Sequence, residues 1–291
     1  RLAVAAGAIL MADFIGCEYI KKTVTEVFMK RIRITVAYDG TDYCGWQIQP
    51  NGITVEEVLN RELSRLLGEK IRIIGASRTD SGVHALGNAA VFDTETRIPP
   101  ERISYALNQR LPEDIVIVRS EEVPADWHPR YQSCVKTYEY HIFNADVPDP
   151  TRRRNTYFVS YPLNLEDMRR AAGYLTGTHD FVSFCNIRTS VEDTVRTIYD
   201  LEISRQEVYG AGSGRDGREI TIRIRGNGFL YNMVRIIVGT LLRVGRGFYT
   251  PEQVKDILEA ENRQAAGVTA PPQGLVLVGI EYLPPVRLDA L

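Results

Sequence analysis

The sequence of 291 residues lacks several features that mark common classes of protein. Its four cysteines, Cys17, Cys44, Cys134 and Cys185, are far apart and form no CxxC pair. This spacing indicates neither a zinc site nor a disulfide framework, so we expect a reducing, cytoplasmic location. Positive charge is not in excess either, because the formal net charge is −2. If the protein binds nucleic acid, the surface that binds phosphate must therefore be local.

The common phosphate-binding motifs are also missing. Residues 210–217 are rich in glycine but lack the GxxxxGK[ST] form, and we expect them at the tip of a hairpin. The apolar run in residues 1–15 is interrupted by Asp13 and is too short to span a bilayer, so no membrane association is predicted. Residues 1–28 are either a signal peptide with Cys17 as a lipidation site or an N-terminal extension ahead of a natural start at Met29. We favour the extension.

The rest of the chain is patterned as an ordinary globular protein. Hydrophobic residues make up 44% and charged residues 25% of the sequence, so a substantial core can form. Apolar residues alternate over residues 31–38, which predicts a strand with one buried face. Residues 55–67 form one apolar helical stripe after a Thr54 and Glu57 capping box. The same criteria predict strands at residues 71–74, 89–92, 115–119, 137–143, 198–204, 220–224 and 275–280, and helices at residues 99–110, 164–176, 229–244 and from 250.

Strands and helices mix without strict βαβ alternation, which favours an α+β fold. The second half repeats the content of the first, so we predict two similar α/β domains with helices flanking the sheets. Their expected bounds are residues 29–133 and 134–284, followed by a tail at 285–291. The predicted helix at 229–244 is too apolar for a helix with one exposed face. It is therefore either central core or part of a subunit interface.

The loop of residues 75–85 carries the most chemistry, because it places Arg78, Asp80 and His84 between two predicted strands. A carboxylate held at the edge of a sheet can serve as a nucleophile or a general base. On residue type alone, a structural turn containing aspartate is the commoner explanation. His84 raises the question of a metal, but no second histidine or carboxylate stands at ligand spacing. We therefore predict no metal site.

This loop closely resembles a known signature. Residues 77–85, SRTDSGVHA, are similar to the signature of the tRNA pseudouridine synthase A family, TruA. The resemblance runs from about Arg31 to Leu283. Further segments match the family in the same order, at residues 38–41 with 45–47 (YDGT, GWQ), 136–140 (KTYEY), 177–184 (GTHDFVSF), 194–198 (TVRTI), 227–235 (NGFLYNMVR) and 270–275 (APPQGL).

The resemblance implies a pseudouridine synthase fold, with mainly antiparallel sheets and an active-site cleft between the two domains. It also implies a role for five residues. Asp80 matches the essential catalytic aspartate, and Arg78 matches an arginine that enters the space left by a flipped base. Tyr138 matches the aromatic residue that stacks on the target uracil. Arg235 matches an arginine that pairs with the aspartate, and Leu275 matches an apolar wall of the pocket.

Three residues depart from the family pattern. Ser77 stands where many members have glycine, Ser81 where many have alanine, and Asn88 where glutamine is frequent. None of them replaces a functional group, so the resemblance still implies an active enzyme.

The implied activity is the isomerisation of uridine to pseudouridine at positions 38, 39 and 40 of the tRNA anticodon stem-loop, by a homodimer that flips the base. Only the uracil atom that joins the ribose changes, so no redox partner, metal or other cofactor is required. The carboxylate either attacks the ring or sugar or removes a proton, and the sequence is compatible with both routes. A nearby Arg235 would favour the charged form of Asp80.

Two other functions are compatible with parts of the sequence. The chain could be an RNA-binding module that has lost the chemistry, or a metal-dependent hydrolase that uses Asp80 and His84. Phosphate contacts are expected from clustered basic residues. The candidates are Arg152, Arg153 and Arg154, then Lys30, Arg31 and Arg33, and finally Arg223, Arg225, Arg243 and Arg246.

Overall fold

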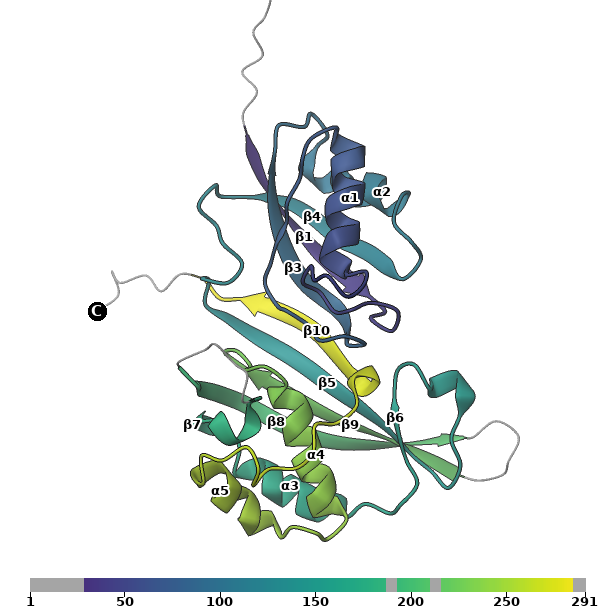
Figure 1. Cartoon of the computed structure of the whole chain (residues 1–291), viewed down its shortest axis with the longest axis vertical. Coiled ribbons are helices and arrows are strands. Elements are labelled where there is room, and N and C mark those ends of the chain that lie inside the picture. Colours follow the sequence, from purple (N-terminus) through teal and green to yellow (C-terminus); the bar gives the residue numbers. More distant parts are fainter. Residues whose placement is uncertain (1–28, 187–192, 210–215, 285–291) are drawn as a thin grey trace, which may run out of the picture.

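The computed structural model describes residues 29–186, 193–209 and 216–284. The predictions made for residues 1–28, for the tail and for the hairpin tip at 210–215 lie outside the described residues. The described chain is an α+β protein with five α-helices and one large, mostly antiparallel sheet (Figure 1). This sheet has ten strands in the order β4-β1-β3-β10-β5-β9-β8-β7, and β2 pairs with β3 while β6 pairs with β5.

The N-terminal half supplies one end of the sheet. Buried residues alternate along β1, with Ile32, Ile34 and Val36 fully buried, as the period-two pattern predicts. Helices α1 and α2 lie beside this half in Figure 1. The elements are β1 (Lys30–Tyr38), α1 (Val55–Leu67), β2 (Ile74–Gly75), β3 (His84–Thr94), α2 (Ile103–Asn108) and β4 (Ile115–Val123).

The C-terminal half supplies the other end of the sheet and three helices. Every residue of α4 except Arg235 and Arg243 is buried, so this helix is central core within a single chain. A Cβ atom at Gly239 would lie 1.7 Å from the Val268 carbonyl oxygen, which shows how closely the backbones pack there. The elements are β5 (Cys134–Asn144), β6 (Tyr157–Val159), α3 (Leu165–Gly173), β7 (Gly177–Asp180), β8 (Val195–Tyr209), β9 (Asp216–Gly226), α4 (Met233–Gly245) and α5 (Pro251–Glu259).

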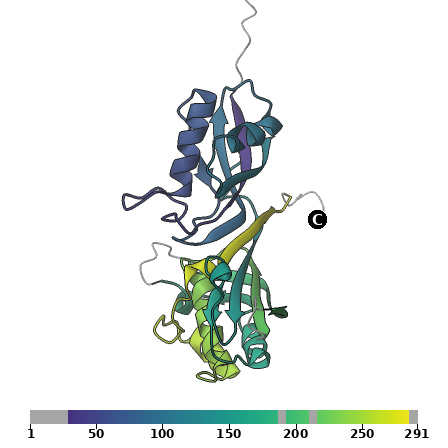
Figure 2. The ribbon, with the colours of Figure 1, turned by 90° about the vertical axis from the view of Figure 1, so that its right-hand side faces the viewer.

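Strand β10 (Leu275–Tyr282) joins the two halves. It pairs in parallel with β3, where Val276 lies opposite His84, and antiparallel with β5, where Leu277 lies opposite Tyr138. Figure 2 shows this yellow strand between the helices of the two halves. The division into domains at residues 133 and 134 stays a prediction, because the sheet runs through both halves without a break.

Several helix boundaries follow the caps that the sequence predicts. The Thr54 side chain accepts a hydrogen bond from the Glu57 backbone at the start of α1, and Asn164 caps α3 in the same way. A reciprocal capping box between Thr250 and Gln253 starts α5. None of the helices in the described ranges is long and apolar enough to cross a membrane.

The prediction of a strand over residues 71–74 is largely wrong, because β2 contains only Ile74 and Gly75. The backbone N–H groups of Ile71 and Ile73 donate to side chains of α1, at Ser64 and Asn60 respectively. These groups are therefore satisfied by a helix and not by a neighbouring strand.

Two helices differ in the structure from the bounds that the sequence predicts. The helix predicted from residue 229 begins at Met233, because Asn232 adopts a left-handed conformation with φ of 61° and interrupts the regular backbone. The helix predicted over residues 99–110 is divided into a 3₁₀ turn at Pro100–Arg102 and α2. The short strands β6 and β7 were not predicted, since three or four residues are too few for a clear alternating pattern.

Candidate active site

A cavity of about 800 Å³ opens where the two halves meet. It contains all five residues to which the sequence assigns a role. Asp80 and Arg78 come from the N-terminal half, and Tyr138, Arg235 and Leu275 come from the C-terminal half. The structure thus brings together residues that are up to about two hundred positions apart in the chain.

The loop that carries Asp80 is held by its own half of the protein. The Thr79 carbonyl accepts from the Trp46 backbone at 3.1 Å, and the Asp80 carbonyl accepts from Val83 at 3.1 Å. Gly82 has φ of 77°, a left-handed conformation that favours glycine. As a result, the Asp80 side chain is fixed in the cavity and only 18% exposed.

Arg235 forms an ion pair with Asp80, with 3.0 Å between Nη1 and Oδ2. The same guanidinium donates to Asn232 Oδ1 at 2.9 Å and to the Ala270 carbonyl at 2.7 Å. Asn232 is the residue with left-handed backbone conformation just before α4. The side chain that accepts from Arg235 is therefore carried by a residue in an unusual backbone conformation. The pairing predicted from the sequence is present.

Burial raises the pKa of the Asp80 carboxyl, and the Arg235 guanidinium opposes this shift without cancelling it. The expected effect of Arg235 is therefore present, but it is smaller than the effect of burial. The result is a carboxylate with little solvent around it, which makes it a better base or nucleophile than an exposed aspartate.

Tyr138 and Leu275 form part of the apolar lining. Tyr138 is buried, and its ring meets Phe229 edge to face with 5.3 Å between centroids. Burial raises the pKa of the Tyr138 hydroxyl well above its usual range, so the phenol is neutral near pH 7. Leu275 is the first residue of β10 and is 5% exposed. Arg78 is exposed at the cavity and has no hydrogen bond or ion pair among the described residues.

Comparisons with known proteins now bear on this geometry. A family model described as tRNA pseudouridine synthase matches residues 34–132 and 171–283. The chain belongs to this family. The tRNA pseudouridine synthase A of a Thermoanaerobacter species is 49% identical over 254 residues, which cover 87% of this chain and 100% of that protein. The proteins of the same name from Acetivibrio thermocellus and Halalkalibacterium halodurans are 46% and 49% identical, over 87% and 85% of this chain and 100% and 91% of their own.

The cavity of this pseudouridine synthase family member also contains three cations that were not assigned a role from the sequence, namely Arg130, Lys136 and Arg196. Arg130 Nε donates to the Gly75 carbonyl at 2.8 Å, and Lys136 Nζ lies 3.5 Å from the Ala76 carbonyl. Lys136 and Arg196 lie within the segments that resemble the TruA family, and this location is the sequence signal by which they could have been identified. Burial lowers the pKa of Lys136, which the nearby Cys134 opposes and the charges of Arg130 and Arg196 reinforce.

The basic residues proposed from the sequence as phosphate contacts mostly have carboxylate partners. On the turn that follows β5, Arg152 pairs with Glu219 at 2.6 Å and with Asp149 at 3.4 Å, and Arg154 pairs with Asp42 at 3.3 Å. Similar pairs hold Arg31, Arg33, Arg223 and Arg225. Arg243 and Arg246 lie over aromatic rings.

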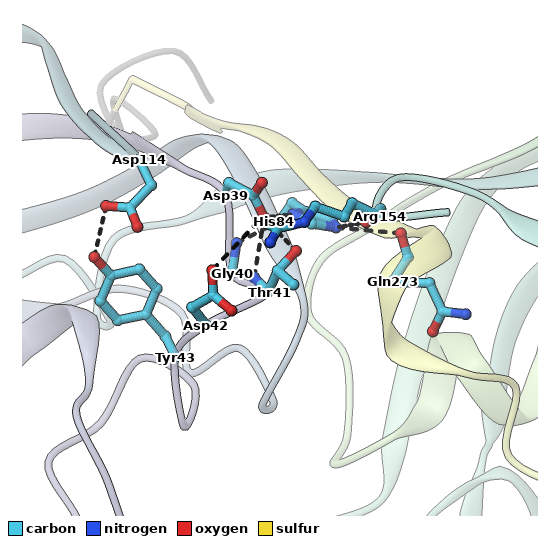
Figure 3. A network of polar contacts seen from close by, with 9 residues as sticks. All are labelled: Asp39, Gly40, Thr41, Asp42, Tyr43, His84, Asp114, Arg154 and Gln273. Atoms are coloured by element: carbon cyan, nitrogen blue, oxygen red, sulfur yellow. Dashed lines mark hydrogen bonds and ion pairs between the residues drawn. The ribbon is translucent and has the colours of Figure 1, made fainter. Parts of the chain in front are cut away.

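His84 lies outside the catalytic cavity and joins the two halves (Figure 3). Its Nε2 is 2.8 Å from the Arg154 carbonyl and 3.2 Å from the Gln273 carbonyl. Because both partners are acceptors, Nε2 carries a hydrogen. Nδ1 lies 3.1 Å from the Gly40 backbone N–H, which donates to it, and 3.1 Å from Asp39 Oδ1. Both ring nitrogens are thus occupied, which gives no support to a hydrolase that uses Asp80 and His84. In the ranges that the structure describes, no group of three or more potential metal ligands comes together.

Proposed function

We propose that this protein isomerises uridine to pseudouridine at positions 38, 39 and 40 of the tRNA anticodon stem-loop. The observation that carries the proposal is the Asp80 and Arg235 ion pair, 3.0 Å long, inside a cavity of about 800 Å³. Membership of the tRNA pseudouridine synthase family supports the reaction. The names of its relatives support tRNA as the substrate.

In this proposal Asp80 is the catalytic residue, and four others form the substrate-binding site around it. Tyr138 stacks on the flipped uracil, Leu275 forms the apolar wall beside it, and Arg235 holds Asp80. Arg78 enters the space that the base leaves in the RNA stem. The exposure of Arg78 supports its role, since it has no partner to give up among the described residues.

The reaction needs no second reactant. The N1–C1′ bond breaks, the C5–C1′ bond forms, the hydrogen on C5 leaves as a proton, and N1 takes up a proton. Asp80 either forms a transient covalent bond with the substrate or removes a proton so that the base leaves as an anion. Both routes require an ionised carboxylate, which Arg235 favours against the effect of burial.

Base flipping sets the binding energy that the cavity must supply. Taking a nucleotide out of a stacked stem costs about a few kcal/mol. Stacking of a base on an aromatic side chain contributes about 1–3 kcal/mol, so Tyr138 alone offsets much of this cost. The cations Arg130, Lys136 and Arg196 are suited to hold the RNA backbone at the same time.

We further propose that the protein acts in the cytoplasm as a homodimer of two-domain subunits, divided at residues 133 and 134 with the cavity as the cleft between the domains. Lining residues from both halves support the cleft. The resemblance to TruA supports the dimer. Because α4 is buried within one chain, the interface must use another surface. A molar mass near 66 kDa in solution, about twice the 32.8 kDa of the chain, would support the dimer, and a monomer would contradict it.

One experiment tests the enzymatic proposal. Unmodified tRNA is incubated with the wild type and with Asp80→Asn, and pseudouridine is mapped by chemical labelling. We expect modification at positions 38 to 40 with the wild type, and a rate lower by about a thousandfold or more with the variant. Failure of the wild type to modify tRNA, while binding it, would favour the non-catalytic RNA-binding module. Full activity of the variant would remove Asp80 from the site.

A further inference from the structure

Ser77 carries an unsatisfied polar group at the candidate active site. Among the described residues, its Oγ is the one buried side-chain oxygen or nitrogen that has no hydrogen-bond partner. The residue is 5% exposed and lines the same cavity as Asp80 and Tyr138. Buried hydroxyl groups in native proteins almost always have a partner, so this one calls for an explanation.

The backbone of Ser77 is held in place by hydrogen bonds to one side chain. Asn88, which is fully buried, accepts from the Ser77 N–H at 3.3 Å and donates to the Ser77 carbonyl at 3.0 Å. Both residues are among the three departures from the TruA pattern, and they contact each other. The chain therefore holds a hydroxyl at a position where the resemblance to the TruA signature leads us to expect glycine.

Ser77 lines the cavity together with Tyr138, the residue that is proposed to stack on the base. Burial raises the pKa of Tyr138, and the Ser77 side chain, as a hydrogen-bonding neighbour of the phenol, opposes that shift. Their geometry is nevertheless not that of a hydrogen bond. Because Ser77 and Tyr138 line the same cavity, a uracil stacked on Tyr138 could give the Ser77 hydroxyl the partner that it lacks in the free protein.

We propose that Ser77 is a substrate-binding residue whose Oγ–H donates a hydrogen bond to a ring carbonyl of the flipped uracil. This proposal rests on the proposed function. The chemistry of the isomerisation suits such a donor. For C5 to take the place of N1, the ring turns about the line through N3 and C6, and this turn exchanges O2 with O4. A donor aimed at one carbonyl therefore meets a carbonyl both before and after the turn.

The proposal predicts opposite effects of one substitution on stability and on activity. Ser77→Ala removes a hydroxyl that is buried without a partner, so the free protein should become more stable, with a melting temperature higher by about 2 °C. The same change removes a bond to the flipped base, so the single-turnover rate at saturating protein should fall about five- to tenfold. The affinity for tRNA should stay within about twofold, because phosphate contacts dominate it.

Ser120→Ala is the matched control. Ser120 is also buried, but its hydroxyl donates to the Pro100 carbonyl at 2.6 Å and accepts from the Ser104 N–H at 2.9 Å, away from the cavity. Its loss should lower the melting temperature by about 2–4 °C and leave the rate unchanged. The two serine variants should thus shift stability in opposite directions.

Base flipping provides a readout that a structural role would not change. A 2-aminopurine next to the target uridine becomes more fluorescent when its neighbour leaves the stack. We expect a smaller increase with Ser77→Ala than with the wild type or Ser120→Ala. An unchanged rate, an unchanged fluorescence increase or a lowered melting temperature for Ser77→Ala would each overturn the proposal. If the wild type forms no pseudouridine at all, the proposed function fails first, and that outcome is distinct from these.

Discussion

The cations of the candidate active site and those of the turn that follows β5 have different partners. In the cavity, Arg130 and Lys136 contact main-chain carbonyls, and Arg78 has no partner among the described residues. On the turn, Arg152 and Arg154 contact carboxylates. A carbonyl accepts a hydrogen bond but adds no net charge, whereas a carboxylate neutralises the cation. Arg78, Arg130 and Lys136 therefore keep their positive charge for a ligand, whereas Arg152 and Arg154 do not.

This difference shows why runs of basic residues are poor guides to nucleic-acid binding. The sequence Arg152-Arg153-Arg154 is the densest positive run in the chain, yet two of its three side chains are paired with acidic groups. The cavity cations are isolated in the sequence and gathered by the fold. A net charge of −2 is compatible with RNA binding for the same reason.

Arg235 is the cavity cation that pairs with Asp80, and its loss should have the largest effect. We expect Arg235→Gln to reduce the rate about a hundredfold at pH 7, because a charged hydrogen bond to Asp80 is lost. Activity requires ionised Asp80, whose pKa burial already raises, so removal of Arg235 raises it further. The acid limb of the pH–rate profile should accordingly move to higher pH.

Arg235→Lys is the control for charge. It keeps a cation near Asp80 but loses the donors to Asn232 and Ala270. The acid limb should lie between those of the wild type and Arg235→Gln. Identical acid limbs for all three proteins would show that Arg235 does not set the ionisation of Asp80.

Lys136 tests whether the cavity charge is used by RNA. We expect Lys136→Met to weaken binding of an anticodon stem-loop about tenfold and to lower the slope of log affinity against log salt by about 0.7–0.9. The pKa of Lys136 is lowered by burial and by the neighbouring arginines. As the pH rises, the wild type should therefore lose affinity for RNA at a lower pH than a protein with an ordinary lysine at this position. Lys136→Arg should keep the affinity and lose this alkaline decrease. Fluorescence anisotropy over salt and pH measures all three effects.

Arg152 should give the smallest effect on RNA. We expect Arg152→Gln to change the affinity less than about twofold and to leave the salt slope unchanged, because Glu219 already neutralises this side chain. Stability should fall by about 0.5 kcal/mol, the contribution of a partly exposed ion pair, which thermal unfolding measures. A salt slope lowered as much as in Lys136→Met would erase the contrast between the two regions.

Periodicity and capping residues were enough to predict most of the fold. The alternation in β1, the Thr250 cap of α5 and the apolar length of α4 all have local causes. Residues 71–73 could not be predicted, because their backbone is bonded by side chains of a helix that precedes them. The continuous sheet was not predicted either, since the pairing of β10 with β3 depends on segments far apart in the sequence.

The candidate site divides in the same way. Asp80 and Arg235 were paired only through resemblance to a family, because residue type says nothing about distance. Lys136 was not identified, since its charge looks ordinary until the surrounding carbonyls and arginines are known. Ser77 appeared only as a departure from a pattern, and its importance depends on a missing hydrogen bond.

Strand β10 delays the formation of the active pocket until almost all of the chain has been synthesised. The Asp80 loop and β3 are made early, but β10 supplies both the strand beside β3 and Leu275 in the cavity. A chain that ends before residue 275 therefore has Asp80 without a complete pocket around it.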